Sequence, residues 1–454
     1  MEGEEGQNGF GRSRRDFLQA LGGAIGVALV SDRSTIEGLA EAASRGGRKG
    51  KKSKLPSGYV FHRVLTVGPN SPGDGDIVEI LPGVMINDRS EVIYHAKTKS
   101  GARAVYRMRI GRGRKPGAYA PSLIVQQGQT LPNGVVVDRI GAGDTNGSGA
   151  YVTVIGEKGG LNAVYVQHPG QPVRQLFKAA SRGPQNARFT GHFGDVDLSG
   201  GGDLLMVARY TLPGELHQGL VHLPGGVTGS LRRGRILLRT GHRIPNSRGL
   251  ITGLGLVERR GPYFIQQVFG RQAKDRARHD FNVEPTGFVS GKLSRGRRGT
   301  RLLVGAQTLK PGRRAVTGEA LVGPRVHKDG TAATVAHKRS AHLDLHLHTN
   351  GGRARIAHTG GKGSRGEIRT ISAPVFGPDG LLYYRTISKK AMELLVLHGD
   401  ERRRILDSGD KIDGSRVRVF NLGWHTDQVD NRGRLAFQAQ FDDGTTAIVI
   451  GTPV

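Results

Sequence analysis

Short apolar runs separated by short polar turns recur along this chain. Runs such as "EVIYHA" and "RLAFQA" follow a turn residue at seven places, after Ser90, Gly149, Gly202, Gly261, Gly330, Gly380 and Gly433. Successive turn residues are 50 to 69 positions apart. A period of roughly 20–50 residues or slightly more is typical of a propeller or a solenoid, because each repeat is one supersecondary unit that must pack on its neighbours.

Each repeat unit contains further apolar runs after its first one. A second run ("ARAVYRM"), a third ("PSLIVQQG") and often a fourth ("GVVVDRIG") follow, each bounded by Gly or Pro. Runs of this length with Val, Ile and Tyr predict strands, and four short strands per unit are typical of a propeller blade. We therefore predict an all-β fold, a β-propeller of about seven four-stranded blades. Six or eight blades remain alternatives.

The seventh unit stops after its second run, at Val454. The stretch from Tyr59 to Asp88 has the pattern of the missing third and fourth runs with the turn between them. An open ring would leave unpaired strand edges, which favour aggregation. We therefore predict that the N-terminal strands close the ring, with Tyr59–Val67 pairing near Thr446–Gly451.

Composition narrows the chemistry. The chain has 454 residues, 72 of them Gly, and no Cys. The absence of Cys excludes disulfides, thiolate metal sites, a thiol nucleophile and a lipoprotein anchor on an N-terminal Cys.

The first 42 residues have the pattern of an export signal. "SRRDFL" precedes an apolar segment that ends at Val30, and Ala40-Glu41-Ala42 offers a cleavage site. The apolar segment is about 14 residues long, whereas a membrane-spanning helix needs ~20. The segment resembles a bacterial twin-arginine signal, which implies a periplasmic or extracellular protein. A buried or anchoring helix is the alternative.

Residues 43–58 are predicted to be a disordered basic linker before a propeller of residues 59–454. Six cations and no acid lie between Ser44 and Gly58, and the whole chain carries a formal charge of +29. Such a tail attracts anionic cell-envelope polymers, lipids or nucleic acid, or it is a solvated spacer. Export and an aromatic content of only 6% disfavour nucleic acid as the main partner.

One turn has the composition of a calcium loop. Asp195, Asp197, Ser199 and Asp203 occupy alternating positions of "DVDLSGGGD", in the manner of oxygen ligands around a hard cation. The stretch resembles the calcium loop of integrin-type (FG-GAP) propeller repeats, with Ser199 where that family has Asp. The resemblance implies calcium at these four residues. The alternative is an acidic turn without a ligand.

A second candidate metal site is the stretch "AHLDLHLH". His342, Asp344, His346 and His348 alternate with Leu, so a strand would place all four on one face. Imidazoles two residues apart reach one transition metal only if they converge. The favoured interpretation is an amphipathic strand whose polar face points to solvent.

The mature chain resembles bacterial exported proteins built from tandem N-x-x-G-x-x-A-F repeats. The last unit carries the match in Asp430, Gly433, Ala436 and Phe437, with Asp in place of Asn. The resemblance implies a repeat fold and export, and it brings no catalytic residues. The chain also contains no G-x-S-x-G, H-E-x-x-H or phosphate-binding G-K-[ST] motif.

Two function classes follow. The first is an exported binding or scaffold propeller without catalytic activity. The second is an exported enzyme that acts on a polysaccharide or another polymer at the central channel. We favour the first because no acid–base pair stands out in the sequence. Carboxylates or His residues converging on the channel would favour the second.

Overall fold

The computed structural model describes most of the chain beyond the predicted signal and basic linker. The described residues are 55–68, 76–111, 120–159, 161–228, 231, 233–245, 249–272, 287–304, 320–337, 343–349, 352–422 and 427–454. The predicted export signal, residues 1–42, lies outside them, and so does most of the linker. Within the described part, no helix is long and apolar enough to span a membrane.

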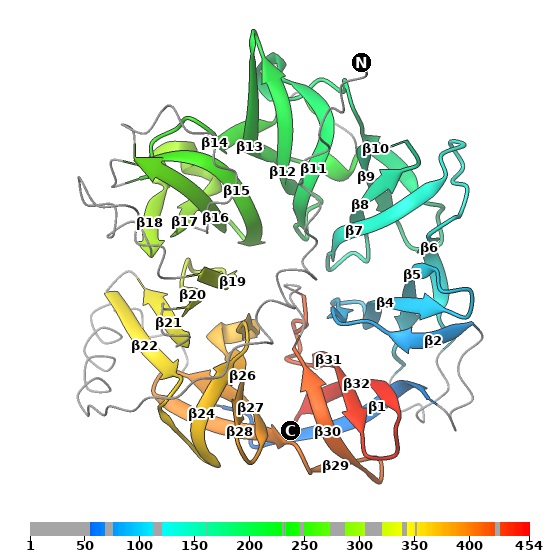
Figure 1. Cartoon of the computed structure of the whole chain (residues 1–454), viewed down its shortest axis with the longest axis vertical. Coiled ribbons are helices and arrows are strands. Elements are labelled where there is room, and N and C mark those ends of the chain that lie inside the picture. The colour runs from blue at the N-terminus through cyan, green and yellow to red at the C-terminus, as the bar shows by residue number, and fades with distance from the viewer. Residues whose placement is uncertain are drawn as a thin grey trace, which may run out of the picture.

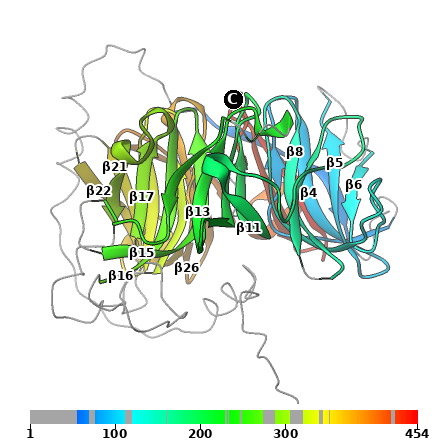
Figure 2. The same cartoon turned by 90° about the horizontal axis from the view of Figure 1, so that it is seen from above.

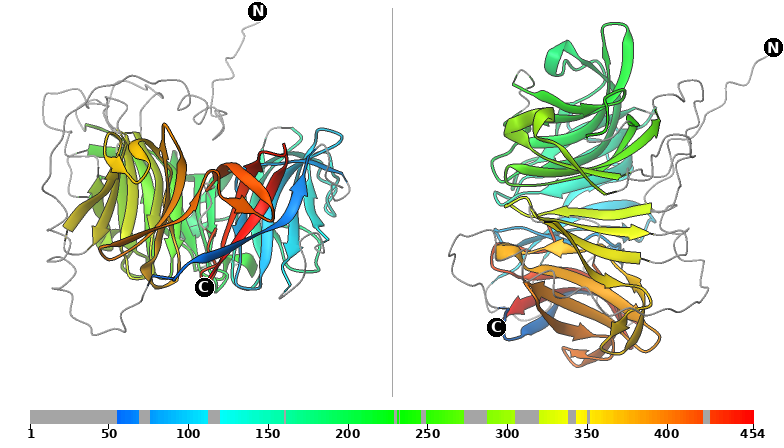
Figure 3. Two further views of the ribbon diagram at one scale, coloured as in Figure 1. Left: turned by 90° about the horizontal axis from the view of Figure 1, so that it is seen from below. Right: turned by 90° about the vertical axis from the view of Figure 1, so that its left-hand side faces the viewer.

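The described residues form seven antiparallel sheets arranged in a ring, so the fold is a seven-bladed β-propeller (Figure 1). Side views show a disc of upright blades (Figures 2 and 3). The prediction of an all-β propeller with about seven four-stranded blades is confirmed. The sequence period of about 57 residues is therefore one blade plus its connection.

The blades are numbered along the chain. Blade 1 contains β2 (Ile77–Ile80), β3 (Met85–Ile86), β4 (Glu91–Thr98), β5 (Arg103–Arg109) and β6 (Ser122–Gln126). Blade 2 contains β7 (Val137–Thr145), β8 (Tyr151–Glu157), β9 (Asn162–Gln167) and β10 (Arg174–Phe177). Blade 3 contains β11 (Arg188–Leu198), β12 (Leu204–Leu212), β13 (Glu215–Leu223) and β14 (Arg235–Arg239). Blade 4 contains β15 (Gly249–Arg260), β16 (Tyr263–Gln272), β17 (Gly287–Lys292) and β18 (Arg301–Val304).

The other three blades follow the same plan. Blade 5 contains β19 (Ala320–Val326), β20 (Ala332–His337), β21 (Leu343–Thr349) and β22 (Gly352–His358). Blade 6 contains β23 (Lys362–Gly363), β24 (Gly366–Ile371), β25 (Val375–Phe376), β26 (Leu382–Ser388), β27 (Met392–His398) and β28 (Glu401–Asp407). Blade 7 contains β29 (Lys411–Ile412), β30 (Ser415–Asn421), β31 (Leu435–Phe441), β32 (Thr446–Pro453) and β1 (Tyr59–Val67).

The sequence unit and the blade are offset by one strand. The fourth run of each unit does not finish its own blade but becomes the innermost strand of the next, as β7 does in blade 2. Innermost strands such as β7, β11 and β15 contact one another around the axis. Every unit therefore links two blades, which helps to hold the ring together.

The predicted ring closure is confirmed for one strand. β1 pairs with β32 in an antiparallel register from Tyr59 with Pro453 to Val67 with Thr446. Figure 3 shows the blue β1 beside the red β32. The next run was predicted to belong to the same blade, and that detail is wrong. It forms β2 and β3, which pair with β4 and open blade 1.

The hydrophobic core is divided into seven clusters, and each lies between two neighbouring blades. The cluster between blades 6 and 7 includes Tyr383, Phe420 and Phe437, all fully buried. The cluster between blades 4 and 5 is the smallest, with Ile265, Phe288, Val326 and Ala332 as its buried members among the described residues. Among the described residues, this seam therefore has the fewest buried apolar side chains.

In each blade a turn joins the innermost strand to the second strand, and six of these seven turns share one conformation. The first residue of each turn donates its backbone N–H to the residue four positions later, as Asn87 does to Glu91 and Asp430 to Arg434. The fourth turn residue has a positive φ, at Ser90, Gly149, Gly202, Gly330, Gly380 and Gly433. Asn or Asp at the first position also caps the turn, since Asn146 Oδ1 accepts from the backbone N–H groups of Ser148 and Ala150. This geometry explains the N-x-x-G pattern of the repeat.

Residues 55–58, the end of the predicted linker, pack against the ring. The Leu55 side chain is 7% exposed within the cluster between blades 6 and 7. Ser57 N–H donates to the carbonyl of Val454 at 2.9 Å. Residues 55–58 are therefore part of the packed ring.

Candidate functional site around the ring axis

Three carboxylates repeat at one position of successive inner strands. Asp144 on β7, Asp197 on β11 and Glu258 on β15 each lie near the end of their strand, where the chain turns back into its blade. All three are buried, with 1 to 4% of each residue exposed. Strand pairing does not by itself require an acid at this position. The hydrogen-bond partners of the three carboxylates explain why acids stand there.

Each of these carboxylates bonds to the backbone of the next blade. Asp144 accepts from Leu198 N–H at 2.7 Å. Asp197 accepts from Arg259 N–H at 2.8 Å. Glu258 accepts from Val326 N–H at 3.4 Å and pairs with the Arg325 guanidinium at 3.2 Å. The three acids form a ladder that ties blades 2, 3, 4 and 5 together, because buried amides need such acceptors.

A salt bridge links blade 4 to blade 7. Arg260 Nη2 lies 2.6 Å from Asp427 Oδ1, in the segment that leads into β31. The Asp427 carboxyl also shares a hydrogen bond with Asp144 of blade 2. We call Asp144, Asp197, Glu258, Arg260 and Asp427 the axial cluster. Its members come from four blades, 2, 3, 4 and 7, which are not all neighbours in the ring.

Burial alters the proton affinities in the axial cluster. Burial, followed by the charges of Asp427 and Asp197, holds the pKa of Asp144 well above its usual range. Burial likewise raises the pKa of Asp197 and of Asp427, in the latter against the opposing Arg260 charge. Glu258 has its pKa raised to about 7 by burial, although Arg325 and Arg260 oppose the shift.

The cluster has the parts of an acid–base site, but most of them are occupied. Asp144 and Asp427 are joined by a hydrogen bond, and 32% of the Arg260 side chain is accessible. Perturbed carboxyls of this kind occur at active sites and also in structural networks. The backbone bonds of Asp144, Asp197 and Glu258 favour a structural role, since an acceptor already in use is less available to a substrate.

The residues of the predicted calcium loop have separate partners. Asp195 Oδ2 accepts from Val257 N–H at 3.0 Å, and Asp197 also bonds to β15. Ser199 begins the shared turn and accepts from Asp203 N–H at 2.9 Å. Asp203 accepts from Gly225 N–H and pairs with Arg259, each at 2.9 Å. The four side chains do not converge on one point in this arrangement.

The predicted histidine face is buried, so the expectation that it points to solvent is wrong. Asp344, His346 and His348 are each 3 to 5% exposed on β21; His342 lies outside the described residues. The Arg353 guanidinium donates to His346 Nε2 at 2.5 Å, and His348 Nε2 lies 2.9 Å from Thr334 Oγ1. Burial and then the charge of Arg353 lower the pKa of His348 to about 3. This polar face lies at the seam between blades 4 and 5, which has the smallest apolar cluster among the described residues.

No group of three His, Asp or Glu residues within the described ranges is arranged to hold a metal ion. Both metal hypotheses, calcium at the β11–β12 turn and a transition metal on β21, therefore stay predictions.

The axial cluster was missed by the sequence analysis, apart from Asp197. One signal was present, since an acid stands two residues before Asn146 and two before Ser199. The aligned turns would have shown this repetition. Arg260 and Asp427 carry no such signal, because their meeting depends on the shape of the ring.

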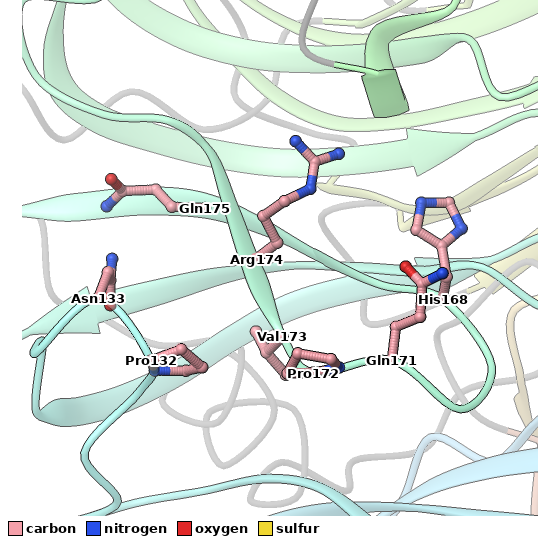
Figure 4. Close-up of a pocket in the computed structure, with 8 residues that line it drawn as sticks. All are labelled: Pro132, Asn133, His168, Gln171, Pro172, Val173, Arg174 and Gln175. Atoms are coloured by element: carbon pink, nitrogen blue, oxygen red, sulfur yellow. The ribbon is translucent and has the colours of Figure 1, made fainter.

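A pocket of about 320 Å³ opens between the β6–β7 connection and the β9–β10 loop (Figure 4). Its lining combines amide side chains with two prolines, at Pro132, Asn133, His168, Gln171, Pro172, Val173, Arg174 and Gln175. Gln175 Nε2 donates to Glu157 at 2.9 Å and to the Tyr165 hydroxyl at 3.0 Å.

Comparison with known proteins leaves the function open. No protein-family model matches the chain, and no curated protein matches it. Among solved structures, it is similar to a chain of the mitotic checkpoint complex at 11% identity and a TM-score of 0.39, covering 94% of this chain and 98% of that one. It is also similar to an ulvan lyase of polysaccharide lyase family PL25, at 10% identity and a TM-score of 0.45, covering 86% and 95%. A puromycin-hydrolyzing peptidase of Mycobacterium tuberculosis is 11% identical with a TM-score of 0.42, covering 86% of this chain and 55% of that one. These neighbours include a chain of a multiprotein complex and two enzymes, and likeness at this level does not distinguish a binding protein from an enzyme.

Proposed function

We propose that this chain is an exported β-propeller that binds a partner without catalysing a reaction. The observation that carries the proposal is the use of the axial carboxylates as ties between blades. General acid–base catalysis needs a carboxyl within hydrogen-bond reach of the substrate. Asp144, Asp197 and Glu258 instead bond to the next inner strand and are almost fully covered.

Anionic cell-envelope polymers and glycans are the partners that we propose. The formal charge of +29 supports this choice, because a strongly basic surface attracts polyanions over distances of about 10 Å at 0.1 M salt. Export to the periplasm or the cell exterior, proposed from the N-terminal signal, would place the protein beside such polymers.

The second candidate is an exported enzyme that acts on a polymer at the ring axis. It is favoured by the hydrogen bond between the Asp144 and Asp427 carboxyl groups, both of which have a raised pKa, beside the partly accessible Arg260. A protonated carboxyl, a partner base and a cation are the groups that polymer hydrolysis uses.

One experiment separates the two functions. The mature protein is incubated with a panel of acidic and neutral polysaccharides, and bound polymer and newly formed chain ends are measured together. We expect binding without new chain ends, and equal binding by Asp427→Asn. Chain ends that form with the wild type and disappear in Asp427→Asn would establish the enzyme instead.

A further inference from the structure

Two stretches in blades 3 and 4 carry cations without acids. The sequence has no Asp or Glu between residues 216 and 257 or between 285 and 318, although both stretches contain several Arg. Elsewhere in the ring, arginines pair with acids, as Arg434 does with Asp430 at 2.5 Å. The two stretches therefore concentrate uncompensated positive charge.

The fold brings these two stretches together. β14, the outermost strand of blade 3, contacts the 3-10 segment Leu293–Gly299 that leads to the outermost strand of blade 4. We call the exposed arginines of this region the blade 3–4 surface, and they are Arg235, Arg243, Arg295, Arg297 and Arg298. None of them forms an ion pair with a carboxylate in the described part of the chain.

The histidines beneath this surface respond to its charge. Burial, and then the charges of Arg297 and Arg239, lower the pKa of His242 to about 4. Burial and the charge of Arg239 lower the pKa of His217 as well, although Glu215 at 3.3 Å opposes the shift. Arg239 Nε donates to His242 Nε2 at 3.0 Å. At neutral pH both rings are therefore uncharged beside several guanidinium groups.

We propose that the blade 3–4 surface binds an acidic polysaccharide, a proposal that rests on the binding function above. Guanidinium groups form paired hydrogen bonds with carboxylate and sulfate groups, and a chain of such groups contacts several arginines at once. A neutral sugar chain would lack these charge-assisted bonds.

Other polyanions fit the surface less well. Single-stranded nucleic acid binds by stacking its bases on aromatic side chains. The ring of Tyr263 in blade 4 is instead in contact with a cation, since Lys292 Nζ lies 5.8 Å from its centroid. An anionic membrane favours several exposed apolar side chains, and Leu216 is the one large apolar residue of blades 3 and 4 that is described as strongly exposed. A hydrated, flexible polysaccharide needs neither feature.

The test compares two triple variants of the full mature protein. Arg243→Gln, Arg297→Gln and Arg298→Gln remove three charges from the blade 3–4 surface. Arg369→Gln, Arg416→Gln and Arg418→Gln remove three exposed charges from blades 6 and 7 as a matched control. Affinity for polygalacturonate oligomers is measured by calorimetry, and circular dichroism confirms folding.

We expect the first variant to bind at least about tenfold more weakly than the control, since each 1.4 kcal/mol is a factor of ten and several charged hydrogen bonds are lost. Equal weakening in both variants would overturn the assignment to this surface and leave the general binding function standing. Tighter binding of duplex DNA or of phosphatidylglycerol vesicles, lost in the first variant alone, would overturn the polysaccharide as occupant. Absence of binding to acidic oligomers would overturn the inference, while the chain-end assay still decides between binding protein and enzyme.

A second measurement, the uptake of protons on binding, does not depend on the stability of the variants. An anion on this surface offsets the charges of Arg297 and Arg239 that act on His242, beside which His217 interacts with Glu215. Its pKa should then rise on binding, so binding at pH 5 should take up protons. Calorimetry in two buffers of different ionisation enthalpy detects this uptake. His242→Gln should reduce it, and identical heats after buffer correction for the wild type would contradict the inference.

Discussion

At the scale of single residues, buried titratable groups determine how this ring responds to pH. The raised pKa of Asp144 means that this carboxyl keeps a proton that the unfolded chain would release, whereas His348 on β21 stays neutral where the unfolded chain would take a proton up. The two effects act at opposite ends of the pH range. Stability should therefore be greatest between them, in mildly acidic to neutral solution.

Asp144→Asn should weaken the loss of stability toward alkaline pH. The Asp144 carboxyl has a raised pKa in the native state. Below about pH 4 it is protonated in both the native and the unfolded state, so it does not change the free energy of unfolding there. As pH rises, the unfolded state loses a proton that the native state keeps, and the free energy of unfolding falls by up to about 1.4 kcal/mol per pH unit. An amide keeps the acceptor for Leu198 N–H and donates to Asp427.

The measurement is urea unfolding at pH 5 and pH 8. The stability of the variant relative to the wild type should be greater at pH 8 than at pH 5. Asp138→Asn, on the same strand but with a side chain 52% exposed, is the matched control. Parallel pH profiles for wild type and Asp144→Asn would contradict the assignment of the raised pKa.

His348→Gln should reduce the loss of stability in acid. The native ring has a pKa of about 3, and the unfolded ring ~6.5. Its contribution is complete above ~6.5 and is lost as pH falls, by roughly 2 to 3 kcal/mol at pH 4.5. A glutamine amide retains a partner for Thr334 and does not titrate. Unfolding at pH 7 and 4.5 tests this, with His168→Gln as control; an unchanged acid loss would count against it.

At the scale of elements, the strand that closes the ring carries stability that no local pattern reveals. β1 is the outermost strand of blade 7, and Phe61 and Tyr59 extend the cluster between blades 6 and 7. Without it, the edge of β32 would be unpaired, which favours association between copies.

Removing residues 43–68 should therefore lower the melting temperature and promote aggregation, while removing residues 43–54 should leave both unchanged. Scanning calorimetry with light scattering measures the two effects. Since the shorter deletion also removes the basic tail, the difference between the deletions isolates β1 and the residues just before it. Equal melting of both deletion variants would mean that the ring does not need this strand.

The β11–β12 turn tests the calcium prediction. A bound ion requires Asp195 and Asp197 to exchange the amides of β15 for calcium. If they do, calcium at 100 times its dissociation constant should stabilise the protein by about 2.7 kcal/mol, and a chelator should lower the melting temperature. Magnesium should substitute poorly because it demands a tighter octahedral shell. Calcium injections without heat at millimolar concentration would withdraw the site.

At the scale of the whole molecule, the seven interfaces are unequal. Six have larger apolar clusters, whereas the seam between blades 4 and 5 combines four buried apolar residues with the pair Glu258–Arg325 and the β21 histidines. Polar interfaces open at a lower free-energy cost than apolar ones of the same area. The ring is closed at blade 7 by strand pairing. Among the described residues, the seam between blades 4 and 5 has the smallest apolar cluster.

The predicted export concerns the whole molecule, because the twin-arginine pathway carries folded cargo. Changing Arg14 and Arg15 to Lys should retain the protein in the cytoplasm if the signal is of this type. Cell fractionation and immunoblotting measure the distribution, with Arg12→Lys as the matched control. Normal accumulation of the double variant outside the cytoplasm would contradict the predicted signal.

The sequence alone determined the repeat and the closure by Tyr59–Val67, and it predicted about seven blades with six or eight as alternatives. These features follow from local patterns, since apolar alternation, Gly at positive-φ turn positions and a truncated last unit are all visible in one dimension. Strand identity depends on neighbours a few residues away, and the ring then follows from repeating one unit. The offset between unit and blade was not visible, because pairing partners are chosen only when blades pack.

Only the tertiary structure decided what the polar residues do. Asp144, Arg260 and Asp427 meet because the ring brings blades 2, 4 and 7 to a common axis, and no spacing in the sequence records that distance. The same holds for Arg243 and Arg297, which gather where two blades touch, and for the β21 histidines, which face blade 4 and not solvent. An amphipathic strand has two faces, and which of them is covered depends on the neighbour that the fold supplies.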